Sequence, residues 1–72
     1  MSYEDNFKSP STYYASINRL VRLYTERGYV NMVYDWERRT RNIADMPDLK
    51  RLARTAEYLY EQLQRPVHVP AN

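Results

Sequence analysis

The residues of this chain that are best suited to act on another molecule are its arginines and tyrosines. The sequence holds nine Arg against two Lys, and eight Tyr against one Phe and one Trp. Tyrosine joins a large apolar ring to a hydroxyl, and arginine presents a planar fork of donors, so both suit half-wet contact surfaces. Both types are also enriched among the residues that dominate binding energy in protein interfaces. We therefore expect the chain to bind another macromolecule through these residues.

The densest group of such residues is the run Glu37-Arg38-Arg39-Thr40-Arg41-Asn42. Arginine forks bind carboxylate and phosphate groups through two parallel hydrogen bonds. Three arginines near Tyr34 therefore fit either an acidic protein partner or a nucleic-acid backbone. Because Asp35 and Glu37 balance part of the charge, the run also fits a simpler interpretation, the solvated face of an amphipathic helix. The helix face and the protein partner are the interpretations that we favour.

Groups suited to catalysis or metal binding are scarce. The chain has no Cys, and His68 is its only histidine. A zinc site needs several nitrogen or sulfur ligands, and a catalytic base needs a positioned partner, which His68 lacks nearby in the sequence. No glycine-rich phosphate loop is present, and Asp45 and Asp48 are explained by a helix start. We predict no enzymatic activity, no catalytic residue, no cofactor and no metal site.

The first of three predicted helices covers residues 11–27. Pro10 fits the first turn of a helix, and Ser9 or Ser11 can cap it. Gly28, the only glycine of the chain, stands where a helix ends in the left-handed conformation. Apolar side chains recur at three- and four-residue spacing, which is typical of one helix face. They are Tyr13, Ile17, Leu20, Val21 and Tyr24.

Residues 29–44 carry patterns of both a helix and a strand. One continuous arc of a helical wheel holds Tyr29, Met32, Val33, Trp36, Thr40, Ile43 and Ala44. Alternation from Val30 to Trp36 would also fit a strand. We predict a helix, because a strand here has no evident partner and the pattern is too long for a typical strand. In this helix Asn31 is the candidate cap, and Trp36 faces the core.

The third predicted helix is the clearest. Asp45 and Met46 are its candidate caps, Pro47 and Asp48 suit its first turn, and Pro66 stops it at about residue 65. Its apolar stripe holds Leu49, Leu52, Ala53, Ala56, Leu59, Tyr60 and Leu63. From this stripe we expect Leu52 and Leu59 to be buried together with Trp36. Arg54 and Tyr58 are four residues apart on the opposite, exposed face.

These elements predict an all-α fold, a small three-helix bundle. Residues 1–10 form a flexible arm, residues 11–65 the helical domain, and residues 66–72 an extended tail. A core of this size gives only marginal stability, and no disulfide can cross-link the chain because it has no cysteine, so we predict a homodimer. Residues 1–10 lack an apolar region and no stretch approaches 18 apolar residues, so we expect no signal peptide, no membrane contact and a cytoplasmic location.

The predicted partner-binding residues are Tyr34, Arg38, Arg41, Arg54 and Tyr58. The function that we expect is a small non-enzymatic protein-binding module: an inhibitor, adaptor or anti-activator of the kind that phages use against host machinery. One alternative is a helix-turn-helix-like nucleic-acid-binding regulator that uses Arg38, Arg39 and Arg41. Its support from charge is weak, because eleven basic and nine acidic residues leave a net charge of only +2. Another alternative is a structural subunit of a larger assembly.

Overall fold

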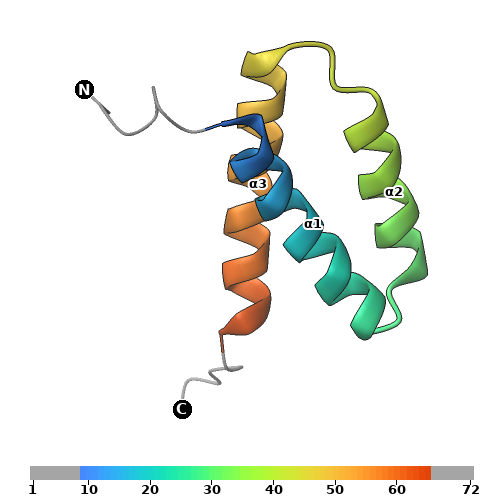
Figure 1. Cartoon of the computed structure of the whole chain (residues 1–72). Helices are drawn as coiled ribbons and strands as arrows, with labels where there is room; N and C mark the ends of the chain where they lie inside the picture. The colour runs from blue at the N-terminus through green and yellow to red at the C-terminus, as the bar shows by residue number, and fades with distance from the viewer. Residues whose placement is uncertain (1–8, 66–72) are drawn as a thin grey trace.

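The computed structural model describes residues 9–65, and they form three helices. The helices are α1 (Pro10–Glu26), α2 (Val30–Arg41) and α3 (Met46–Gln64) (Figure 1). Within residues 9–65 there is no strand, so the helix prediction for residues 29–44 is confirmed and the strand alternative is wrong. The predictions for the arm up to residue 8 and for the tail, including His68, lie outside the described residues.

Helix α1 is the central element of the fold. It packs against both α3 and α2, whereas α2 and α3 meet only weakly. In Figure 1 α1 and α3 both descend along the chain direction, while α2 runs back upward on the far side of α1. The outer faces of α2 and α3 therefore belong to different sides of the molecule. None of the described helices is long and apolar enough to cross a membrane.

The turn between α1 and α2 is built on a left-handed glycine. Gly28 has a φ of 76°, a conformation that is strained for residues with a Cβ atom. Its N–H donates to the carbonyl of Thr25 over 3.1 Å, and the Tyr29 N–H donates to the carbonyl of Tyr24 over 2.9 Å. These bonds satisfy carbonyls that the end of α1 would otherwise leave unpaired. The predicted role of Gly28 as a helix terminator is confirmed.

The cap at the start of α2 differs from the prediction. The residue at the N-cap is Tyr29, which makes no side-chain cap, so the prediction of Asn31 as the cap is wrong. The turn at Gly28 already sets the direction of the chain, and the helix begins directly after it. Arg38, Arg39 and Arg41 occupy the last turn, where positive charge is favourable beside the negative end of the helix dipole.

The start of α3 is fixed by two aspartates. Asp45 is the N-cap, and its carboxylate accepts a hydrogen bond from the Asp48 N–H over 3.0 Å. The Asp48 carboxylate accepts in turn from the Ala44 N–H over 3.3 Å. The predicted helix start is therefore confirmed. At α1, by contrast, the Ser9 hydroxyl contacts the Ser11 hydroxyl at 2.8 Å and caps no backbone N–H.

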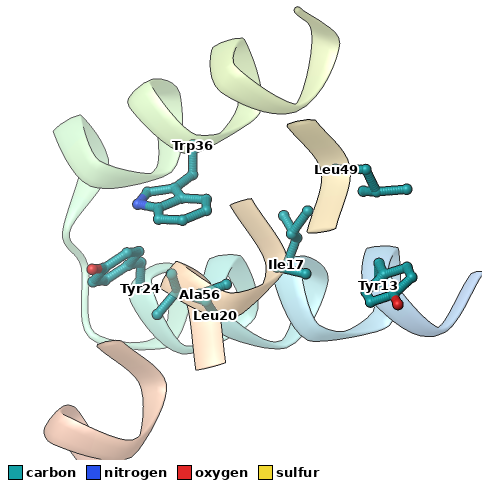
Figure 2. Packing of buried hydrophobic residues seen from close by; sticks show 8 residues of the cluster. Tyr13, Ile17, Leu20, Tyr24, Trp36, Leu49 and Ala56 are labelled. Atoms are coloured by element: carbon teal, nitrogen blue, oxygen red, sulfur yellow. The ribbon is translucent and has the colours of Figure 1, made fainter. Parts of the chain in front are cut away.

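All three helices contribute to the buried core. Its residues are Tyr13, Ile17, Leu20, Leu23, Tyr24, Trp36, Leu49, Ala53 and Ala56. Ile17 and Leu20 are the largest side chains that are completely enclosed. Figure 2 shows the indole of Trp36 pointing from α2 toward Tyr24 and Leu20 of α1. The prediction that Trp36 faces the core is confirmed, and Trp36 is the one residue of α2 that is buried.

Parts of the predicted core are more open than the sequence indicated. Leu52 and Leu59 are only partly buried, although they pack against the core. Helix α2 would have to cover that side of α3, but it packs mainly on α1. Tyr29 and Met32, from the predicted apolar arc, are 44% and 42% exposed. Figure 1 explains this, because the first turns of α2 lie beside the last turns of α1 and away from α3.

Candidate functional site

The five predicted binding residues line two different hollows of the surface. Tyr34, Arg38 and Arg41 line an open hollow of about 430 Å³ on α2, together with Asn31, Asp35 and Glu37. We call these six residues the α2 site. Arg54 and Tyr58 line a second hollow of about 560 Å³, formed by α3 with Arg19 of α1. The structure thus brings the first three predicted residues together and places the other two elsewhere.

The periodicity of α2 aligns the α2 site. Asn31, Tyr34, Arg38 and Arg41 follow one another at intervals of three, four and three residues, so they form one stripe along the helix. Trp36, which projects into the core, holds the opposite face of α2 against α1. Asn31 and Arg38 consequently point away from α1, whereas Tyr34 and Arg41 also border hollows that are shared with α1. Tyr34 is 66% exposed, the most open of the large apolar side chains in residues 9–65.

The three arginines of α2 have different surroundings. Arg39 Nε donates to Asp35 Oδ2 over 2.9 Å, and its guanidinium lies 5.9 Å from the Trp36 ring. Arg38 reaches Asp35 Oδ1 at a longer distance of 3.4 Å. Within residues 9–65 the guanidinium of Arg41 has no hydrogen-bond or ion-pair partner. Arg39 is therefore turned back toward the core edge, while Arg38 and Arg41 offer donors to an incoming molecule.

Asp35 is the acidic centre of this group. The hydrogen bond from Arg39 lowers the pKa of the Asp35 carboxyl, and the bond from Arg38 and the two positive charges act in the same direction. Its carboxylate is therefore ionised over the whole range around neutral pH. One acidic group thus neutralises part of two arginines, so the positive potential of the α2 site is smaller than the count of arginines indicates.

An apolar hollow adjoins the α2 site at the start of α2. It has a volume of about 250 Å³, and it shares Tyr34 and Glu37 with the α2 site. Its other lining residues are Thr25, Gly28, Tyr29, Val30 and Val33. Sequence reasoning missed Val30 and Val33 as site residues. The available signal was the position of Val30, an apolar residue that falls outside the apolar arc of the predicted helix.

The hollow on α3 is occupied largely by contacts that hold α1 and α3 together. The Arg19 guanidinium stacks over the Tyr60 ring, 4.1 Å from its centre. The Glu57 carboxylate accepts a hydrogen bond from the Ser16 hydroxyl over 2.7 Å. Both pairs join α1 to α3, so these side chains already have a structural task. Tyr58, at 61% exposure, projects from the same region into solvent.

The described residues offer contacts for binding but no clustered metal ligands. Across residues 9–65 no group of three or more His, Cys, Asp or Glu side chains lies close enough to hold a metal ion. What the α2 site provides is two arginine forks, one exposed tyrosine and an adjoining apolar hollow. Comparison with protein-family models, with curated proteins and with solved structures finds no match to this chain.

Proposed function

We propose that this chain is a small protein-binding module and that the α2 site is its contact surface. The observation that carries the proposal is the placement of Tyr34. Tyr34 is 66% exposed, and it lines both the apolar hollow and the hollow that holds Arg38 and Arg41. An exposed tyrosine beside arginines matches the composition of interface hot spots, where aromatic area and charged hydrogen bonds act together.

The surroundings of Tyr34 define the kind of partner that fits. Arg38 shares Asp35 with Arg39 at a longer distance, so a carboxylate from outside can compete for its fork. The apolar hollow beside Val30 and Val33 accommodates an aliphatic or aromatic side chain. The partner surface that we infer therefore combines an acidic residue with a neighbouring apolar one.

The nucleic-acid alternative has less support from the same residues. A recognition helix places its N-terminal residues against the bases. In α2 the arginines lie in the last turn, and the start of the helix presents exposed Tyr29 and Val30. Asp35 also engages Arg38 and Arg39, two of the three arginines that would contact phosphates. A negative charge at this position opposes polyanion binding.

The test compares two exposed tyrosines on different helices. A partner captured from the source cells is purified, and its affinity is measured for the parent chain, for a Tyr34→Ala/Arg38→Ala variant and for Tyr58→Ala. Tyr58 is the matched control, because it is exposed to a similar extent on α3. We expect the α2 variant to bind about 30-fold more weakly or worse, since hot-spot residues contribute about 2 kcal/mol or more. Tyr58→Ala should bind like the parent.

Two outcomes would contradict the proposal. Loss of binding in Tyr58→Ala with retention in the α2 variant would move the contact surface to α3. Tight binding of the parent to random duplex DNA, with an affinity that collapses between low and moderate salt, would favour the nucleic-acid regulator. Neither Tyr34 nor Arg38 is buried, so we expect the α2 variant to keep its fold. Circular dichroism of each variant checks this.

A further inference from the structure

A line of exposed side chains runs along the outer face of α3, on the side turned away from the core. Its members follow one another at intervals of three, four, three and four residues, which is the spacing of a helix face that packs lengthwise on a second helix. They are Arg51, Arg54, Tyr58, Glu61 and Arg65, and all five are exposed. We call these five residues the α3 stripe. Tyr58 lies at its centre and is 61% exposed.

The charges of the α3 stripe follow an order that the helix itself does not favour. Arg51 and Arg54 lie in the first half of α3, and Glu61 lies in the last turn. The helix dipole favours acidic side chains at the start of a helix and basic ones at its end. Within residues 9–65 the Glu61 carboxylate has no hydrogen-bond or ion-pair partner, and Arg51 reaches only the half-exposed Asp48, at 3.2 Å. The charge order is therefore not explained by contacts within one described chain.

We propose that the α3 stripe is the interface of a twofold homodimer in which the α3 helices of two copies lie antiparallel. An antiparallel copy brings the basic half of one stripe beside the acidic end of the other, so the stripe is complementary to itself. In the register that we infer, Arg51 of each copy faces Glu61 of the other, and the twofold axis lies level with residue 56. Positions that face one another then add up to 112, so residue 48 lies opposite residue 64. Since α3 spans Met46–Gln64, the two helices overlap over residues 48–64, about 25 Å of helix length.

The same register sets the contacts at the centre of the interface. Tyr58 of each copy lies opposite position 54 of the other, so its ring meets the guanidinium of Arg54 twice about the axis. An arginine against the face of a tyrosine ring is attractive, and the attraction grows when water is excluded. Arg65 lies opposite position 47, next to Asp48 of the other copy. Each charged residue of the α3 stripe thus meets an opposite charge or an aromatic ring.

The size of the core supports a second copy as the occupant of this face. The chain has 72 residues and no cysteine, and only Ile17 and Leu20 are large side chains that are completely buried. Domains of this size often reach adequate stability by self-association. A partner surface of one charge sign would face either the arginines or the glutamate with a like charge, whereas a second copy satisfies both.

The proposed dimer does not rest on the proposed function. Helices α2 and α3 each pack on α1 and scarcely on each other, and they lie on either side of it (Figure 1). The dimer therefore leaves the α2 site of both copies open. Its test uses the purified chain alone, without any other protein, so that a failure of the dimer and a failure of the α2 site are distinguished.

The test is a charge exchange followed by sedimentation analysis over micromolar to millimolar concentrations. Arg51→Glu and Glu61→Arg each place two pairs of like charge across the interface, so each should raise the dimer dissociation constant about tenfold or more. The double variant R51E/E61R restores both pairs and should dimerise like the parent. An equimolar mixture of the two single variants should form a heterodimer. The matched controls are Arg22→Glu and Glu26→Arg, the same exchanges at exposed positions of α1, which should leave the dissociation constant unchanged.

Each result either supports the proposal or overturns it. Weakening by both single exchanges, with rescue by the double variant and by the mixture and no effect of the α1 controls, is the expected result. A parent chain that stays monomeric at millimolar concentration overturns the homodimer itself. A dimer that is insensitive to both single exchanges overturns its location on α3, and a dimer that the double variant does not rescue overturns the register. Thermal melts of the variants in dilute solution check that the monomer fold is intact.

Discussion

The strongest test of the fold compares two leucines that both lie on predicted apolar stripes but differ in how deeply the structure buries them. Leu20 is completely buried, with 0% exposure, whereas Leu59 is partly buried. Alanine at position 20 removes three carbon atoms from a closed site near Trp36 and leaves a cavity. The expected loss is about 3–5 kcal/mol, in the upper part of the range for such substitutions. At position 59 part of the volume is already open to solvent, and the expected loss is about 1–2 kcal/mol.

The total stability of the domain decides how these losses appear. A single core in a chain of this length supplies about 3–5 kcal/mol. Leu20→Ala should therefore unfold most of the population, while Leu59→Ala should stay folded with a lower midpoint. Urea unfolding is followed by far-ultraviolet circular dichroism and by fluorescence, since the only tryptophan, Trp36, is buried and reports directly on the core. Ile17→Val, expected to cost about 1 kcal/mol, gives a measurable reference at a second enclosed site.

The opposite ranking would refute this account of the packing. If Leu59→Ala destabilises the domain as much as Leu20→Ala, α3 must bury a different face. The core would then extend over the side that α2 leaves open. A measured loss for Leu20→Ala below the reference loss of Ile17→Val would likewise show that position 20 is not enclosed.

Two further predictions concern the turn and the pH dependence of stability. Gly28→Ala should lower the free energy of unfolding by about 1 kcal/mol, because φ is 76°, and no more than that, because the added Cβ would meet no atom within 4 Å. Gly28→Asn should lower it by less, since asparagine tolerates the left-handed conformation better. Equal melting temperatures of the parent and Gly28→Ala would show that the turn is not left-handed. Burial, and after it the charges of Asp35 and Tyr29, raise the pKa of Tyr24 above its ordinary value of 10.0. The unfolded chain therefore loses this proton first, so the contribution to stability is complete below about pH 10 and falls as pH rises through the higher folded-state pKa. Urea midpoints measured from about pH 9 to pH 11 should fall less steeply in Tyr24→Phe, and parallel curves would contradict the raised pKa.

The sequence predicted the helices well because their ends are encoded locally. Gly28 acts through backbone hydrogen bonds, and the Asp45 and Asp48 carboxylates accept hydrogen bonds from backbone N–H groups within a few residues. Such signals do not depend on the rest of the fold. The burial of Leu52 and Leu59 was predicted less well. It depends on where α2 lies relative to α3, and that placement is set by packing over the whole chain.

The candidate site divides in the same way. The common stripe of Tyr34, Arg38 and Arg41 follows from helical periodicity alone, and the structure places all three around one hollow. The turning of Arg39 toward Asp35 and Trp36 requires side-chain geometry, which spacing does not contain. The separation of Arg54 and Tyr58 from the other three residues requires the arrangement of α2 and α3 on either side of α1.

The central position of α1 has a consequence for how the molecule opens. Since α2 and α3 each pack on α1 and scarcely on each other, their detachments are separate local unfolding events. The α1–α2 contact is the smaller of the two and rests largely on Trp36, so amide protons of α2 should exchange with solvent at a lower free energy than those of α1. A ligand that binds only the state in which α2 packs on α1 suppresses this opening. Its apparent affinity should rise with any change that increases the population of that packed state. Opening or closing of α2 should change the hydrogen exchange of α3 only if it also affects α1, the helix on which both α2 and α3 pack.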